Sequence, residues 1–395
     1  MNASDDGLLT SLLEASSQRW ALYVLLGQSA LVFFTMTGNT LVCLSISLDK
    51  KLHGLTNYLL LSLAVADLAV AVFVMPPGIL MIFLDNKWFF GQTLCSAWLM
   101  SDVLMCTSSI MHLTTISIDR YFAVAYPLKA NARQTRFQVI MKIFIVWMLS
   151  FLISCPVLFI SLRSTTAEFY CVFDDRYFKI YGSIAAFFIP LVAMVITFTL
   201  TTKILNQKAR LCKSYGKPEE NPSSYKGNIR NTYLTAPATI SSNTLKRICQ
   251  LNHFKHSIQK SQQLKISNEQ KALKFLGVVF ASFVLCWLPF FTVNFASGIS
   301  GLPLLPDEIF TVLVWSGYVS STINPFLYLI FNERFRHAYY KLVFCRYCSP
   351  SYLEMERMRA IDQSITCVSF RKTDNLGSAR NSTVGLKNVI CTHSI

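Results

Sequence analysis

Long apolar stretches, separated by shorter polar segments, dominate the chain. A bilayer core about 30 Å thick is crossed by a helix of roughly 20 mostly apolar residues. Seven stretches are long enough: 22–46, 56–80, 95–124, 139–161, 179–204, 271–297 and 308–330. The pattern therefore predicts an all-α membrane protein, a bundle of seven transmembrane helices.

Polar segments divide the rest of the chain. Residues 1–20 and 345–395 are expected to be an extracellular and a cytoplasmic tail around a seven-helix bundle over 21–344. Residues 205–268 are rich in Lys, Ser, Asn and Thr without apolar periodicity, which predicts a disordered cytoplasmic loop. Between Asn332 and Leu342 apolar residues gather on one face, which predicts a short eighth helix along the membrane interface.

Composition and charge agree with lipid as the solvent. The chain is 53% hydrophobic and 14% charged, whereas water-soluble domains carry about a quarter charged residues. Its net charge of +15 comes from basic residues that flank the apolar stretches on one side. Basic loops mark the cytoplasmic side, so the amino terminus is expected outside and the carboxyl terminus inside. These basic residues flank membrane spans and do not form a basic surface on a folded domain. A nucleic-acid partner is therefore not expected.

Two cysteines lie on the expected outer side. Cys95 begins the third span and Cys171 lies in the loop between the fourth and fifth. An oxidising compartment favours a disulfide between them over two unpaired thiols. Cys345 and Cys348 follow the interfacial helix and are candidates for palmitoylation, the alternative being inert thiols. A sequon makes Asn2 a candidate for glycosylation.

Ionisable residues inside the spans are the first functional candidates, because burying them in lipid is costly. They are Asp67 in the second span, Asp102 near the outer end of the third, and Asp119 and Arg120 at its inner end. Asp102 and Arg120 are eighteen residues apart, which is five helical turns and roughly 27 Å along one face. That face must line the interior of the bundle.

The sixth and seventh spans combine a polar and aromatic stripe with proline. A stripe at helical spacing is usually mere packing, but Pro289 and Pro325 remove backbone donors and predict kinks. The stripe of the sixth span contains Phe283, Trp287, Phe291 and Asn294.

These residues together resemble the rhodopsin-type, or class A, G-protein-coupled receptors. The resemblance touches every span. It is carried by Gly38-Asn39, Leu63-Ala64-Val65-Ala66-Asp67, Asp119-Arg120-Tyr121, Trp147, Pro190, Cys286-Trp287-Leu288-Pro289 and Asn324-Pro325-Phe326-Leu327-Tyr328.

The resemblance implies how the chain would signal. Arg120 would pair with Asp119, and with Glu269, at rest, and would then turn to a G protein when the sixth span moves. The residues implied in coupling and activation are Asp119, Arg120, Tyr121, Glu269, Phe283, Pro289, Asn324, Pro325 and Tyr328. A polar network of Asn39, Asp67, Ser320 and Asn324 would hold an allosteric sodium ion. Arrestin, a receptor kinase and membrane lipid are further expected partners, and the plasma membrane is the expected location.

Asp102 would anchor a ligand ammonium, because a carboxylate in a low-dielectric site offsets the cost of burying an amine. The alternative is an aspartate paired with a basic residue of the bundle. Aromatic rings around it would add cation–π contacts, which resembles the aminergic subfamily. The implied ligand residues are Asp102, Val103, Cys106, Thr107, Ser183, Ala186, Trp287, Phe290, Phe291, Asn294, Trp315 and Tyr318.

The fifth span offers one hydroxyl, Ser183, toward the ligand ring. This favours serotonin over dopamine, octopamine or tyramine. The segments Ser108-Ser109-Ile110-Met111-His112-Leu113 and Gly182 to Pro190 resemble those of type 2 serotonin receptors, and that resemblance implies signalling through a Gq-class protein. An ion-coupled transporter is the alternative from another class, although no internal repeat supports it. No catalytic or metal-binding constellation falls at one depth, so neither an enzyme nor a metal site is expected.

Overall fold

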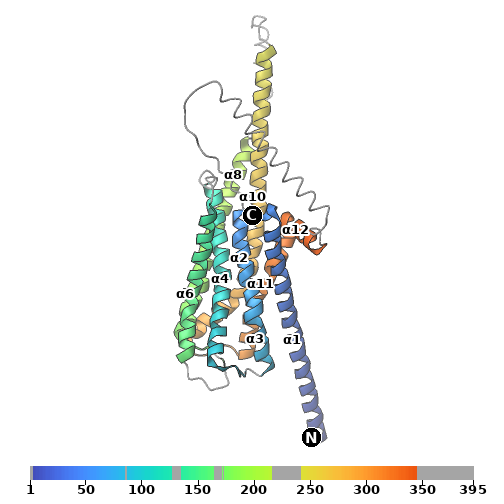
Figure 1. Cartoon of the computed structure of the whole chain (residues 1–395), viewed down its shortest axis with the longest axis vertical. Helices are drawn as coiled ribbons and strands as arrows, with labels where there is room; N and C mark the ends of the chain where they lie inside the picture. Colours follow the sequence, from blue (N-terminus) through green and yellow to red (C-terminus); the bar gives the residue numbers. More distant parts are fainter. Residues whose placement is uncertain are drawn as a thin grey trace. The chain divides into compact units, whose positions relative to one another are not determined.

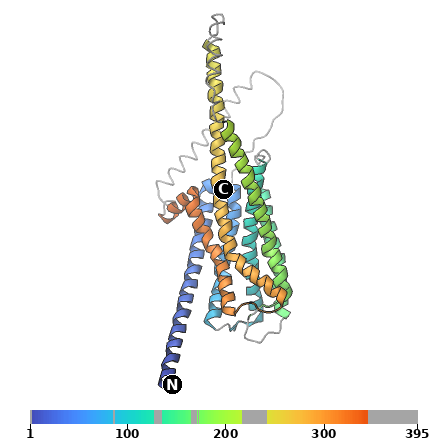
Figure 2. The same ribbon diagram turned by 180° about the vertical axis from the view of Figure 1, so that it is seen from behind.

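The computed structural model describes residues 3–84, 87–126, 135–163, 171, 173–215 and 242–344. The chain divides into two compact units, Met1–Arg336 and His337–Ile395. The described part of the first unit is a bundle of helices (Figures 1 and 2).

All seven expected spans are helical. The second and fifth spans each contain a π-helical segment, η2 and η3, between two α-helical parts. The elements are α1 (Ala3–Leu48), η1 (Lys50–Leu52), α2 (Leu55–Ala69), η2 (Val70–Val74), α3 (Met75–Phe83), α4 (Gly91–Ala125), α6 (Arg136–Arg163), α7 (Arg176–Ser183), η3 (Ile184–Phe188), α8 (Ile189–Tyr215), α10 (Ser242–Ser300) and α11 (Asp307–Phe331). α10 and α11 continue through Pro289 and Pro325 as unbroken helices.

Six stretches of helix are long and apolar enough to cross a membrane, from Leu22–Leu48 to Ile266–Ser300. α11 is not one of them, because it carries polar residues such as Ser321, Thr322 and Asn324. These side chains are buried, and α11 packs between α1 and α10. The seventh helix is therefore polar on the side that faces protein.

Close approach of α1 to α11 depends on a glycine. A Cβ added to Gly38 would lie 2.9 Å from two side-chain atoms of Pro325. Glycine alone lets the two backbones pack at this distance, so the Gly38-Asn39 pair brings α1 against the polar part of α11.

The expected disordered loop over 205–268 needs correction at both ends, and the expected tail over 1–20 is helical from Ala3. α8 continues to Tyr215, α10 begins at Ser242 and α1 begins at Ala3. The two loop flanks contain no Gly or Pro, and their Lys, Gln, Leu and Ala residues favour helix, so each span extends past its apolar part. The middle of the loop, 216–241, lies outside the described residues.

The expected eighth helix is α12 (Glu333–Val343). Its first turn is capped by Asn332, whose Oδ1 accepts a hydrogen bond from the backbone N–H of Arg334 at 3.1 Å. Phe335 is fully buried and stacks on Tyr328 of α11, with ring centroids 5.4 Å apart. The amphipathic pattern predicted this helix correctly.

Candidate functional site

Asp102 lies on α4 and is half-buried. Its Oδ2 accepts a hydrogen bond from the Tyr318 hydroxyl at 2.9 Å, and its Oδ1 accepts from the Cys106 thiol at 3.3 Å. Among the residues that the structure describes, no Lys or Arg lies within ion-pair distance of this carboxylate. The expected alternative, an aspartate neutralised by the bundle, is therefore not found in this part of the chain.

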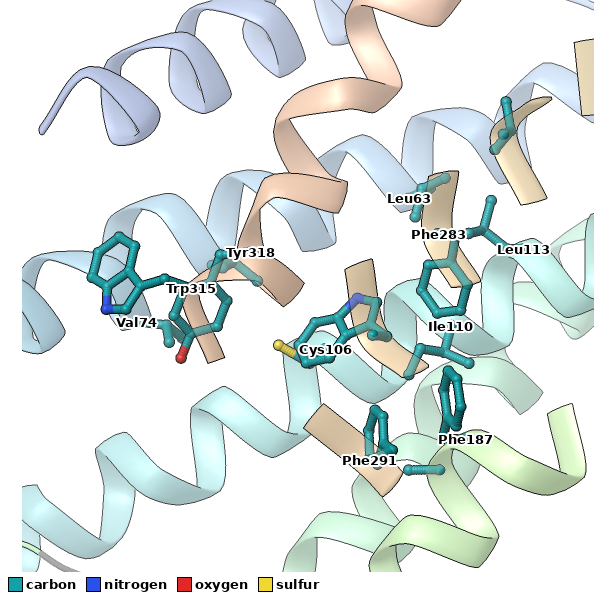
Figure 3. Packing of buried hydrophobic residues seen from close by; sticks show 14 of the residues in the cluster. Leu63, Val74, Cys106, Ile110, Leu113, Phe187, Phe283, Phe291, Trp315 and Tyr318 are labelled. Carbon is teal, nitrogen blue, oxygen red and sulfur yellow. The ribbon is translucent and has the colours of Figure 1, made fainter. Parts of the chain in front are cut away.

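Aromatic rings from α10 and α11 pack around Tyr318, the partner of Asp102; Trp315, Tyr318 and Phe291 are labelled in Figure 3. Trp315 meets Tyr318 edge to face, with centroids 5.4 Å apart. Trp287 is 6.4 Å from Tyr318 and 5.6 Å from Phe291. The rings continue inward, since Phe291 stacks on Phe187 at 4.5 Å. A carboxylate with aromatic faces beside it suits a cation.

The Trp287 indole is held in place from two sides. Its Nε1 donates to the Ser320 hydroxyl at 2.9 Å. Its ring lies flat against Gly317, where an added Cβ would come within 2.5 Å of a ring carbon. Ser320 was expected in the polar network around Asp67, and the structure instead shows it bonded to this tryptophan.

Ser183, the hydroxyl expected to face the ligand ring, is fully buried. Ser183 Oγ donates to the Lys179 carbonyl at 2.6 Å and accepts from Asn294 Nδ2 at 3.1 Å. Asn294 itself is partly exposed. A direct contact between Ser183 and a ligand therefore requires the Asn294 amide to turn away, and Asn294 is the accessible polar group here.

The other expected ligand residues differ in access. Ala186 and Thr107 are buried, with 3% and 2% of their surface exposed, so they line the deep side of the region. Val103 and Phe290 are partly exposed, and Phe290 packs on Trp287 at 5.9 Å.

A second polar cluster surrounds Asp67, which is fully buried on α2. Its carboxylate accepts hydrogen bonds from Ser109 at 3.0 Å, Ser321 at 2.8 Å and Asn324 at 2.9 Å. Asn39 Nδ2 donates to the Ser321 carbonyl at 3.1 Å, and its Oδ1 has no partner among the described groups. Sequence reasoning missed both serines, although Ser321 precedes Asn324 by one helical turn and so shares its face.

The Asp119 end of α4 corrects one expectation. Asp119 pairs with Lys142 of α6 rather than Arg120, with Oδ1 and Nζ 2.6 Å apart. In the described part of the chain Arg120 has no ion pair with Asp119 or Glu269; it lines a small cavity with Glu269 and Thr201. Neighbouring residues on a helix point about 100° apart, so Asp119 faces α6 while Arg120 faces α8 and α10.

Other residues implied in coupling form aromatic contacts. Tyr121 meets the ring of Phe122 at 5.4 Å, and Tyr328 meets Phe275 of α10 at 5.8 Å. Phe283 is buried 6.2 Å from Phe187, directly inward of Trp287. Phe283 is thus linked through Phe187 and Phe291 to the Trp287 ring.

His112 is a fully buried core residue with both ring nitrogens hydrogen-bonded. Its Nδ1 donates to the Ser108 carbonyl at 2.7 Å, and its Nε2 accepts from the Ser62 hydroxyl at 2.8 Å. Trp147 Nε1 donates to the same hydroxyl at 3.0 Å. These hydrogen bonds tie α2, α4 and α6 together.

The expected disulfide is confirmed. Cys95 at the start of α4 is bonded to Cys171, with Cα atoms 5.6 Å apart. Both residues are buried beside Trp88. Asn2, Cys345 and Cys348 lie outside the described residues, so glycosylation and palmitoylation remain predictions.

Comparison with known proteins gives the family. The model of the 7 transmembrane receptor (rhodopsin family) matches residues 38–328. The mouse 5-hydroxytryptamine receptor 2C is 38% identical over 370 residues, covering 88% of this chain and 76% of the relative. The human 5-hydroxytryptamine receptor 2C is 38% identical over 331 residues, covering 80% and 71%. These relatives are receptors rather than enzymes, and the chain belongs to the rhodopsin family of seven-transmembrane receptors.

Proposed function

We propose that this receptor binds a biogenic amine, with serotonin the favoured ligand, and signals through a heterotrimeric G protein of the Gq class. The observation that carries the proposal is the Asp102 carboxylate, which bonds the Tyr318 hydroxyl of an aromatic cluster and has no basic partner in the described bundle. The relatives named 5-hydroxytryptamine receptor 2C support the choice of serotonin.

The anchor works by charge. A protonated amine that binds at Asp102 exchanges part of its water shell for the carboxylate. In surroundings of low dielectric constant, the attraction between the two opposite charges is several-fold stronger than in bulk water. The Tyr318 hydroxyl keeps one carboxylate oxygen oriented, and the faces of Trp287 and Trp315 add cation–π attraction, about 0.5–2 kcal/mol each.

The ring end of the ligand would meet Asn294. Its amide is the accessible polar group between α7 and α10, with Ser183 behind it. One accessible amide suits a ring with one hydroxyl better than a catechol, which favours serotonin or tyramine over dopamine. The indole favours serotonin over tyramine, since its larger ring buries more apolar surface against the aromatic cluster.

The Asp67 cluster fits a sodium ion. A carboxylate, the Ser109 and Ser321 hydroxyl oxygens and the unpartnered Asn39 Oδ1 are the oxygen ligands that a hard cation prefers. When bound, the ion would supply a positive charge that stabilises one arrangement of α2, α4 and α11. Arrestin, a receptor kinase and membrane lipid are further proposed partners, with the amino terminus outside the plasma membrane.

The experiment is a calcium-release assay on cells that express the receptor, with serotonin, dopamine, octopamine and tyramine applied in turn. We expect the strongest response to serotonin and its loss in Asp102→Asn, at unchanged surface expression. Asp307→Asn is the matched control, since that aspartate is exposed at the start of α11. The proposal would be contradicted if the receptor reached the cell surface and responded to no amine. It would also be contradicted if Asp102→Asn left the affinity for the amine unchanged.

A further inference from the structure

Two adjacent charges at the inner end of α4 have separate surroundings. Asp119 meets the Lys142 ammonium at 2.6 Å, and the two side chains are 17% and 31% exposed. Arg120 lies in a cavity with Glu269 of α10 and Thr201 of α8, at no ion-pair distance from either carboxylate among the described residues. The Asp119 carboxylate is therefore paired with a residue of α6, while the Arg120 guanidinium faces α8 and α10.

Lys142 is an unexpected residue in its span. It is a charged side chain in the otherwise apolar stretch 139–161, and an ion at that position is costly unless it has a partner. The structure supplies that partner from α4, twenty-three residues earlier in the chain. The charge of Lys142 is best explained by its effect on the Asp119 carboxylate of α4.

The contact between α4 and α6 is held at three depths. At the outer end Ser96 donates to the Ser161 hydroxyl at 2.9 Å. In the middle the His112 and Trp147 rings meet edge to face at 6.0 Å. Lys142 and Asp119 form the third tie at the inner end. Because the two helices are fixed elsewhere, the ammonium stays within reach of the carboxylate.

We propose that Lys142 is a positioning residue for activation: its ammonium holds the Asp119 carboxylate against α6 and so leaves Arg120 available to the cytoplasmic partner. The proposal rests on the proposed coupling to a G protein, but not on the identity of the ligand. Lys142 acts through Asp119 and need not touch the partner.

The physical reason is competition for one carboxylate. Guanidinium and carboxylate form strong two-pronged hydrogen bonds, so Arg120 is the nearest strong competitor for Asp119 once the ammonium is removed. An Asp119 that turns to Arg120 holds the guanidinium on α4 and withdraws it from the cavity beside Glu269. Loss of the lysine charge should therefore reduce coupling, and it should do so only while residue 119 is charged.

The test is an epistasis measurement without any amine. Recruitment of minimal G proteins of the four Gα classes is measured by energy transfer in cells and normalised to surface expression. We compare the wild type with K142M, K142R, D119N and the double variant D119N/K142M. K203M is the matched control, because Lys203 is an exposed lysine on α8.

K142M should lower basal recruitment by about fivefold, the ratio that corresponds to about 1 kcal/mol, while K142R and K203M stay near the wild type. In the D119N background the same K142M change should have no effect. If K142M does not reach the surface, K142Q replaces it. Thermal unfolding in detergent serves as a second readout. The loss of stability in the double variant should be smaller than the sum of the losses in the two single variants.

Equal recruitment in the wild type and K142M, including none in either, would overturn the proposal. So would a loss that persists in the D119N background, since Lys142 would then act by another route. The absence of any amine response would contradict the ligand proposal alone. It would not affect the recruitment comparison, which is made without an amine.

Discussion

The contact between Gly317 and Trp287 allows a sharp test of how the ligand region is built. In Gly317→Ala the new methyl group would lie 2.5, 2.7 and 2.7 Å from three carbons of the indole ring. Favourable carbon contacts begin near 3.5 Å, so the ring must move by about 1 Å. The neighbouring Phe291, Phe290 and Tyr318 rings limit that movement.

The cost of the substitution has three parts. Overpacking of a core costs about 1–3 kcal/mol, and a weakened hydrogen bond from Trp287 to Ser320 adds about 0.5–1.5 kcal/mol. Alanine is the better helix former by about 1 kcal/mol, which acts in the opposite direction. We therefore expect Gly317→Ala to lower the free energy of unfolding by about 0.5–3.5 kcal/mol.

The assay is thermal unfolding of the purified receptor in detergent, followed by an amine dose–response in cells. Gly27→Ala is the matched control, because nothing lies within 4 Å of a Cβ at that position of α1; it should leave the unfolding midpoint unchanged or raise it. Trp287→Phe has a smaller ring and should remove most of the penalty of Gly317→Ala. If Gly317→Ala is as stable as the wild type, the packing argument is wrong.

Three further predictions concern other parts of the bundle. Cys171→Ser should lower surface expression and cost about 2–5 kcal/mol of stability, and adding Cys95→Ser should cost nothing more, since the bond is already lost. Arg176→Gln removes two hydrogen bonds of 2.9 Å to carbonyls in the last turn of α10; it should lower the unfolding midpoint, while Arg163→Gln, at an exposed residue of α6, should not. Asp67→Asn should abolish any effect of sodium on stability and amine affinity, because the amide carries no charge to attract the cation; a sodium effect that survives would refute the proposed ion site.

The seven spans could be predicted from the sequence alone, because lipid imposes one requirement on every crossing helix. Each must present about 20 apolar residues, and that requirement is met locally, within one segment. The position of Asp102 and Arg120 on one face follows equally locally from their eighteen-residue spacing and the helical repeat. The disulfide between Cys95 and Cys171 followed from which side of the membrane each cysteine occupies.

Partners across helices could not be predicted in this way. The pair of Asp119 and Lys142 depends on how α4 and α6 are rotated against each other, and the sequence contains no local signal of that rotation. The same holds for Ser320, which bonds to Trp287 while its neighbour Ser321 bonds to Asp67. Adjacent residues on a helix point about 100° apart, so a small difference in rotation decides which partner each hydroxyl meets.

The sequence by itself determined the number of crossings, their apolar lengths and the faces that carry charge, because these depend on residues close together in the chain. The tertiary structure decided which charges and hydroxyls meet, and it also showed that Ser183 is buried behind Asn294. Such contacts depend on the packing of side chains from helices far apart in the sequence, where a shift of one ångström makes or breaks a hydrogen bond.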